Sequence, residues 1–126
     1  MKEVMAIVRM NKINATKKAL IEAGVSSMTA QECLGRGKGL INMNLLKGAE
    51  EGHEEAIAQL GQGDRLYPKR AIFVVVPDQL VQKTVDTIIE ANQTGKPGDG
   101  VIWVKPTEDS ISVRTSERGD AVLDEF

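Results

Sequence analysis

The sequence lacks several features that would mark a specialised class of protein. One Cys in 126 residues excludes a disulfide within the chain and fits a reducing compartment. No apolar run approaches the roughly 20 residues of a membrane-spanning helix. Charge of neither sign dominates, because 16 Lys and Arg stand against 18 Asp and Glu. We therefore expect a cytoplasmic protein whose main partner is neither nucleic acid nor a membrane.

Aromatic residues are also scarce. With one Trp, one Tyr and two Phe, the core must consist mainly of aliphatic side chains and Met. A chain of this length can bury one such core, so residues 1–126 are expected to form a single domain.

Two apolar runs predict the central strands. Val4–Val8 and Ala71–Val76 contain only apolar residues, which is typical of strands covered on both faces. Shorter strands are expected at Met28–Leu34, at Val101–Val104 and, from its apolar–polar alternation, at Ile111–Arg114.

Two amphipathic helices are predicted between these strands. One covers Lys12–Ala23, with Asn11 as its N-cap. The other covers Gln79–Asn92 and is capped by Pro77 and Asp78. Its apolar stripe is expected at four positions: Val81, Val85, Ile88 and Ile89.

The order of these elements is βαβ, a long connection, and βαβ again. It predicts an α+β fold, a ferredoxin-like βαββαβ sandwich with an antiparallel four-stranded sheet and both helices on one face. The other face should alternate with polar residues if it met water, but the two long runs do not. We therefore expect another subunit to cover it.

The long connection runs from Gly35 to about Arg65 and holds seven glycines. Connections of this length in a compact domain are usually functional or disordered. A brief helix is expected at Glu54–Leu60. His53 stands among glutamates, where a metal site is conceivable but a solvated side chain is favoured.

A second glycine-rich stretch, Thr94–Gly100, lies between a helix and a strand. Its three glycines in seven residues relax φ and let backbone N–H groups converge on one point. Lys96 adds a positive charge, and Asp99 can bond neighbouring amides or orient a bound group. Such a loop suits phosphate, although a turn without a ligand explains it equally well.

Short motifs along the chain carry a family resemblance. They are Gly48–Glu50, Pro68–Lys69, Val74–Asp78, Val85–Ile89, Thr94–Lys96, Gly98–Gly100, Arg114–Thr115 and Glu117–Gly119. In this order they resemble the PII signal-transduction proteins over nearly the whole length. The resemblance implies a trimer of ferredoxin-like subunits with sheets facing inward, which agrees with the burial pattern.

The resemblance also implies that ATP or ADP binds between neighbouring subunits, with 2-oxoglutarate beside it and Mg²⁺ held through both ligands. A dianionic keto acid and a polyphosphate need cations and amide dipoles that converge in one cleft. The implied nucleotide site comprises Thr29, Gly35, Gly37, Val75, Gly95, Lys96, Gly98, Asp99, Gly100, Arg114 and Arg118. The implied 2-oxoglutarate site comprises Gly39, Lys69 and Gly98.

By the same resemblance, residues of about 37–65 form the T-loop, the arm that docks on target proteins, and about 115–126 form a C-terminal tail. The expected T-loop contacts are Lys38, Leu45, Leu46, Lys47, Glu50 and Glu51.

Some residues depart from the common PII pattern. Glu51 replaces a Tyr that most members uridylylate, and Gly39 replaces a glutamine that helps to hold Mg²⁺. Val101 and Ser112 replace basic residues that assist with phosphates. The altered T-loop resembles the nitrogenase-linked branch, whose members act as a pair of subunits, and here the second member of that pair.

We therefore expect a sensor without catalytic activity that controls nitrogenase, as a homotrimer or as a heterohexamer with a sister PII-like subunit. A general PII regulator of ammonium transport or glutamine synthetase remains an alternative. A small phosphate-handling enzyme is a further alternative, which the lack of an evident nucleophile–base pair disfavours.

Overall fold

The computed structural model describes residues 1–37 and 65–124. The chain divides into two compact units, Met1–Cys33 with Lys69–Phe126 and, separately, Leu34–Pro68. Several predicted features lie outside the described residues: Gly39, His53, the helix at Glu54–Leu60, and the T-loop contacts Lys38, Leu45, Leu46, Lys47, Glu50 and Glu51.

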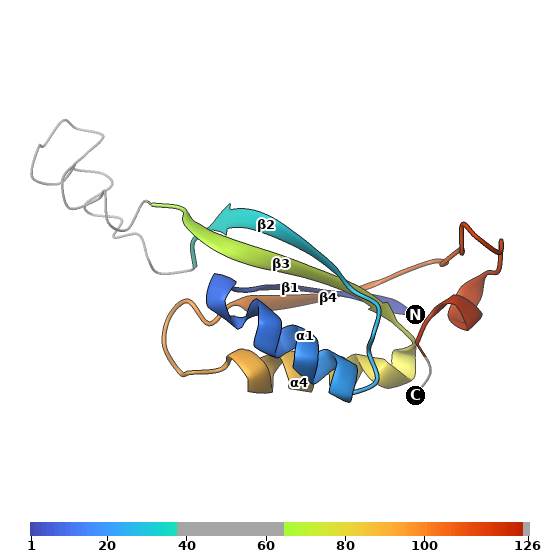
Figure 1. Ribbon diagram of the computed structural model, residues 1–126, viewed down its shortest axis with the longest axis horizontal. Helices are drawn as coiled ribbons and strands as arrows, with labels where there is room; N and C mark the ends of the chain where they lie inside the picture. Colours follow the sequence, from blue (N-terminus) through green and yellow to red (C-terminus); the bar gives the residue numbers. More distant parts are fainter. Residues whose placement is uncertain (38–64, 125–126) are drawn as a thin grey trace, which may run out of the picture. The chain divides into compact units, whose positions relative to one another are not determined.

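The strands and the two long helices follow the predicted order. The elements are β1 (Lys2–Arg9), the 3₁₀ helix η1 (Met10–Lys12), α1 (Ile13–Glu22), β2 (Thr29–Gly35), β3 (Tyr67–Val76), α4 (Asp78–Asn92), β4 (Val101–Pro106) and the 3₁₀ helix η2 (Gly119–Val122). The strands form one sheet in the order β2-β3-β1-β4, in which β1 is antiparallel to β3 and β4. Both α-helices lie on one face of this sheet (Figure 1). The α+β, βαββαβ-like fold is confirmed.

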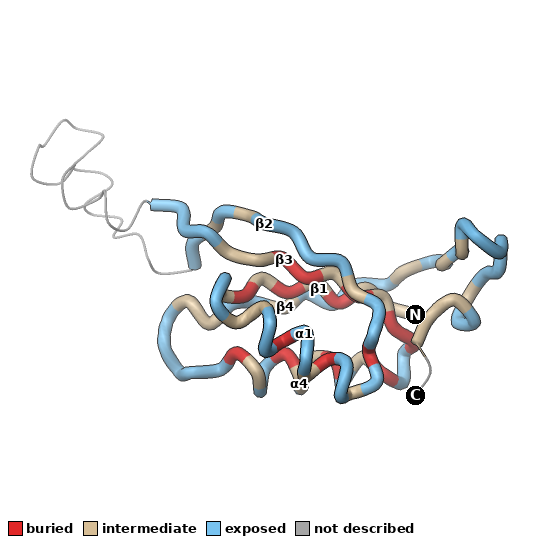
Figure 2. The backbone as a smooth tube through the Cα atoms, viewed as in Figure 1, coloured by how far each residue is buried: buried red, intermediate tan, exposed pale blue. Residues whose placement is uncertain are grey.

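The core lies between the sheet and the helices. Val4, Ala6 and Val8 of β1 are buried, and the residues between them are half-buried. Leu20 of α1 and Ile88 of α4 belong to the same cluster. Figure 2 shows the buried stretches on the central strands and on the helices beneath them. None of the helices in the described chain is long and apolar enough to cross a bilayer.

The middle of the opposite face of the sheet is apolar, as expected. Met5 stands in register with Phe73 on β3 and with Trp103 on β4. Trp103 is 51% exposed although it belongs to a sheet. Within the described part of one protomer, this face has no helix against it (Figure 1).

The predicted apolar stripe of α4 is correct in part, because Ile88 is buried and Val81 and Val85 are partly buried and pack against the core. The buried residues are Leu80, Thr84, Ile88 and Asn92, while Ile89 is 42% exposed. Polar residues can face the core here because their side chains find partners. Thr84 Oγ1 donates to the Leu80 carbonyl at 2.7 Å, and Asn92 Nδ2 donates to the Ile88 carbonyl at 2.9 Å.

The predicted helix caps also need correction. Asn11 lies within η1, and Lys12 occupies the N-cap of α1 without a side-chain bond. Pro77 is the N-cap of α4, so Asp78 is the first helical residue, and its carboxylate lies 3.7 Å from Lys2 Nζ. Gly24, with a φ of 92°, follows the C-cap residue Ala23 and ends α1.

Ile111–Arg114 was predicted as a strand, and this is wrong. Only an isolated bridge joins Ile111 to Arg118. The reason is local: Ser116 N donates to the Ser112 carbonyl at 2.8 Å, which closes the chain into a turn. Val113 in this turn is 100% exposed.

Candidate functional site

The loop from Thr94 to Gly100 (hereafter the glycine loop) carries α4 back to the sheet. Gly95, Gly98 and Gly100 have positive φ values of 83°, 97° and 121°. A Cβ on Gly100 would lie 2.0 Å from the backbone oxygen of Ile7. The missing side chain therefore lets the loop touch β1, immediately before β4 begins to pair with it.

Asp99 braces this loop. Its Oδ2 accepts the backbone N–H groups of Thr94 at 2.7 Å and Gly95 at 2.9 Å. Its Oδ1 accepts the Thr94 hydroxyl at 2.5 Å and Nη1 of Arg9 at 2.6 Å. The hydrogen bonds from Thr94, with those from Arg9 and Gly95, hold the pKa of the Asp99 carboxyl well below its usual value.

Two cations converge on Gly98. Arg9 ends β1 and stands directly opposite Lys69 on β3. Arg9 Nη2 donates to the Pro97 carbonyl at 3.1 Å, and Lys69 Nζ donates to the Gly98 carbonyl at 3.3 Å. A Cβ on Gly98 would lie 3.3 Å from Arg9 Nη2 and 3.7 Å from Lys69 Nζ. Glycine at this position therefore leaves room for the Arg9 guanidinium, while Lys69 Nζ would be in ordinary contact with a Cβ.

Arg9 was not among the residues predicted for the site. Its register with Lys69 follows only once β1 and β3 are paired antiparallel. That pairing was implied by the predicted fold, so counting register from the two apolar runs could have identified Arg9.

The cluster of Arg9, Lys69 and the glycine loop can bind an anion. Arg9 carries five N–H donors and Lys69 three. Arg9 uses one on Asp99 and one on Pro97, and Lys69 uses one on Gly98. The Arg9 side chain is 26% exposed, so it is not fully enclosed by the loop.

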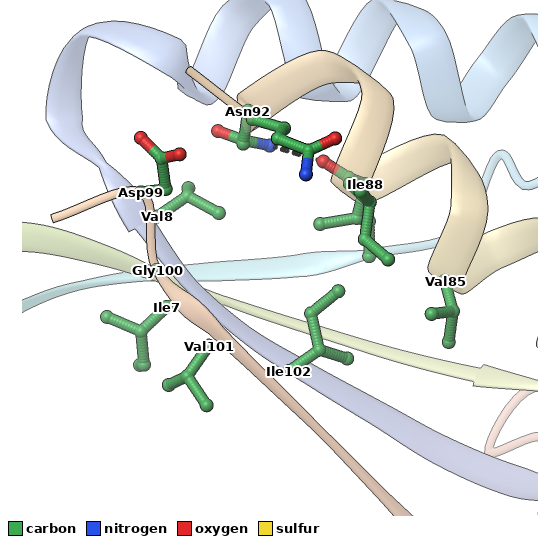
Figure 3. A pocket seen from close by; sticks show the side chains of 11 residues that line it. Ile7, Val8, Val85, Ile88, Asn92, Asp99, Gly100, Val101 and Ile102 are labelled. Atoms are coloured by element: carbon green, nitrogen blue, oxygen red, sulfur yellow. Dashed lines mark hydrogen bonds between the residues drawn. The ribbon is translucent and has the colours of Figure 1, made fainter. Parts of the chain in front are cut away.

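An apolar groove of about 460 Å³ begins at the same loop and runs between α4 and β4 (Figure 3). Its walls are mostly aliphatic, and the lining includes Val85, Ile88, Asn92, Asp99, Gly100, Val101 and Ile102. The glycine loop thus borders two environments, a cationic one at Gly98 and an apolar one beyond Gly100.

The chain was compared with known proteins. Residues 1–117 match the family described as "Nitrogen regulatory protein P-II". The chain belongs to the P-II family. This is a family of regulatory proteins rather than enzymes, so the expectation of a protein without catalytic activity is confirmed.

Several curated P-II relatives span the full length of the chain. "Nitrogen fixation nifHD region GlnB-like protein 2" of Methanobacterium ivanovii is 43% identical over 124 residues, covering 98% of this chain and all of the relative. A protein of the same name from Methanococcus maripaludis is 42% identical over 123 residues, with the same coverage. "Nitrogen regulatory protein P-II 1" of Escherichia coli is 37% identical over 123 residues, again with the same coverage.

The P-II fold brings part of the predicted site together. Lys69, Gly98 and Asp99 are joined by hydrogen bonds in one cluster with Arg9. Asp99 bonds the loop itself, and the Gly95 amide is directed at Asp99 rather than outward. Lys96 is exposed on the same loop.

Other predicted residues of the P-II site lie elsewhere. Arg118 Nη1 pairs with Asp109 Oδ2 at 3.0 Å, and Arg114 is exposed in the preceding turn. The remaining predicted residues are Val75 in β3, Thr29 at the start of β2, and Gly35 and Gly37 in the separate unit Leu34–Pro68.

No group of three or more His, Cys, Asp or Glu side chains in the described ranges could hold a metal ion.

Proposed function

We propose that this P-II protein senses a nucleotide and 2-oxoglutarate together and uses its T-loop to regulate nitrogenase. The observation that supports this best is the convergence of Arg9 and Lys69 on Gly98, within the glycine loop. A dicarboxylate needs paired cations, and a polyphosphate needs free amides and positive charge beside them.

The nucleotide assignment rests on the rest of the loop. Gly98 and Gly100 hold backbone conformations that favour glycine, and a loop of this kind can turn backbone N–H groups toward an anion. Lys96 is exposed and can add charge. Arg114 and Arg118, which are both exposed, would then contact the nucleotide from a neighbouring protomer.

An oligomer with inward-facing sheets is supported by the uncovered apolar face around Met5, Phe73 and Trp103. Trp103→Glu is expected to convert the oligomer into monomers, because a carboxylate would be buried without a partner. Light scattering after size exclusion measures this. A Trp103→Glu chain of unchanged mass would contradict the proposed interface.

Nitrogenase is proposed as the target because relatives matching the full chain carry the words "nitrogen fixation nifHD region" in their names. The test is nitrogenase activity with increasing amounts of this protein, alone or with its sister subunit. We expect inhibition that 2-oxoglutarate relieves. Unchanged activity at saturating protein would refute this target.

Ligand binding is tested by calorimetric titration of 2-oxoglutarate with and without MgATP. We expect binding that requires MgATP and is lost in Lys69→Ala, while the oligomer persists. Lys83→Ala, which removes an exposed lysine from α4, is the matched control. Full 2-oxoglutarate binding in Lys69→Ala would contradict the site.

A further inference from the structure

The Arg9–Asp99 ion pair connects two parts of the site that are 90 residues apart in sequence. Arg9 is the last residue of β1, and Asp99 lies near the end of the glycine loop. The pair is short, at 2.6 Å, and both side chains are about three-quarters buried, with 26% and 23% exposed. Partial burial and a short distance favour a defined geometry over a loose surface contact.

Asp99 is already engaged on every side. Its two oxygens accept four hydrogen bonds, three from Thr94 and Gly95 and one from Arg9. A carboxylate so occupied has little capacity for a ligand. Its negative charge would also oppose a phosphate directly, so its function is to fix the loop.

Arg9 differs from Asp99 because its hydrogen-bonding capacity is only partly used within the loop. Two of its five N–H donors bond Asp99 and the Pro97 carbonyl, which leaves three that these two contacts do not use. Its Nη2 also lies close to the Cβ position of Gly98, next to Lys69 Nζ. One planar group therefore contacts the loop and borders the place where an anion would meet Lys69.

We infer that Arg9 is a positioning residue that couples the two ligands. This rests on the proposed function. A dicarboxylate held by Lys69 and Arg9 fixes the guanidinium plane, and the guanidinium fixes Asp99. Asp99 in turn fixes the amides of Thr94 and Gly95, and so the shape of the loop that receives the nucleotide. Because coupling between binding sites is reciprocal, the nucleotide must strengthen dicarboxylate binding by the same factor.

The experiment measures the coupling factor, which is the Kd for ATP without 2-oxoglutarate divided by the Kd with saturating 2-oxoglutarate. Wild-type protein, Arg9→Lys, Asp99→Asn and the double variant are titrated calorimetrically with Mg²⁺ present. Arg9→Lys keeps the charge but loses the planar fork, and Asp99→Asn keeps the shape but loses the charge.

We expect a wild-type factor of about 5 or more that falls below about 2 in each single variant. The double variant should be no lower than either single one, because both changes break one link. Arg70→Lys, which alters a neighbouring cation paired with Glu32, should retain the wild-type factor. The coupling factor is a suitable readout. A variant that merely weakens the ATP site would raise the Kd for ATP equally with and without 2-oxoglutarate, so the factor would not change.

Amide exchange gives an independent readout. On addition of 2-oxoglutarate, the Thr94 and Gly95 amides should become more protected in the wild type and not in Arg9→Lys. If both single variants keep the coupling factor and the ligand-induced amide protection, the proposed role of the Arg9–Asp99 pair is refuted, while the proposed function stands. A wild-type protein that binds neither ligand would overturn the link and the proposed function together.

Discussion

Replacing Gly100 with alanine should destabilise the protein strongly, because two separate penalties add. The first is conformational. Gly100 has a φ of 121°, a region almost reserved for glycine, where another residue costs about 1–3 kcal/mol. The second is steric. The new Cβ would lie 2.0 Å from the Ile7 oxygen, and that atom belongs to the backbone of β1.

A backbone oxygen in a central strand cannot rotate away as the end of a side chain can. Relief requires separating the loop from β1, at the start of the β1–β4 pairing. Forcing additional atoms into packed structure typically costs about 1–3 kcal/mol. The sum is about 2–6 kcal/mol, a large fraction of the about 5–15 kcal/mol that stabilises a typical domain.

Alanine substitutions at two other glycines distinguish the conformational penalty from the steric penalty. Gly95 has a φ of 83° but no atom within 4 Å of its Cβ position, so Gly95→Ala should cost about 1 kcal/mol from strain alone. Gly35 has neither constraint, so Gly35→Ala should stay within about 0.5 kcal/mol of wild type. The assay is urea unfolding followed by circular dichroism. If Gly100→Ala and Gly95→Ala cost the same, the steric argument is refuted.

Three further predictions follow from hydrogen bonds. Thr16→Val should cost about 1–3 kcal/mol in urea unfolding, because Asn92 Nδ2 donates to Thr16 Oγ1 at 2.9 Å in a buried site. Much of that cost should be recovered in Thr16→Val with Asn92→Leu, and an additive double variant would contradict the pairing. The lowered pKa of Asp99 means that its stabilising effect is present above about pH 4 and is lost as the pH falls toward its folded pKa. Asp99→Asn should therefore lose less stability than wild type between about pH 4 and pH 2, and parallel acid curves would exclude this role. Asp124 accepts the Ser26 amide at 3.1 Å and its hydroxyl at 2.5 Å, so Asp124→Ala should speed exchange of the Ser26 amide. An unchanged exchange rate would show that this contact does not persist in solution.

The sequence predicted the strands well because apolar runs report burial directly. Val4–Val8 and Ala71–Val76 could hardly form anything other than central strands, and β1 and β3 contain them. The exposed apolar face opposite the helices was also expected, since neither run alternates with polar residues.

Local patterns could not predict which polar residues enter the core. Thr84 and Asn92 face inward on α4 because carbonyl groups one turn earlier accept their protons. Hydropathy treats both as surface residues, so the predicted stripe left them out and included Ile89, which is exposed. Hydrogen-bond partners in the folded structure therefore decide which residues of α4 are buried, rather than the periodicity of its apolar residues alone.

Only part of the candidate site could be predicted from the sequence. The glycine loop and Lys69 were identified from motifs, whereas Arg9 depended on strand register. Nothing near Arg9 in the sequence indicates that it would meet Asp99. The resemblance implied that Arg114 acts at a site between subunits. The contacts of such a residue depend on a second subunit, which the sequence of one chain does not place.

The charges at Gly98 also constrain what can occupy the site. Arg9 and Lys69 contribute two positive charges and Asp99 one negative, so the cluster carries +1 (2 − 1 = +1). Like charges directly opposite on neighbouring strands repel, so the pairing of Arg9 with Lys69 favours the binding of an anion between them. A monoanion would bring the cluster to neutrality, but a dianion would leave it at −1. A dianionic metabolite is therefore accommodated best when one further positive charge lies beside it.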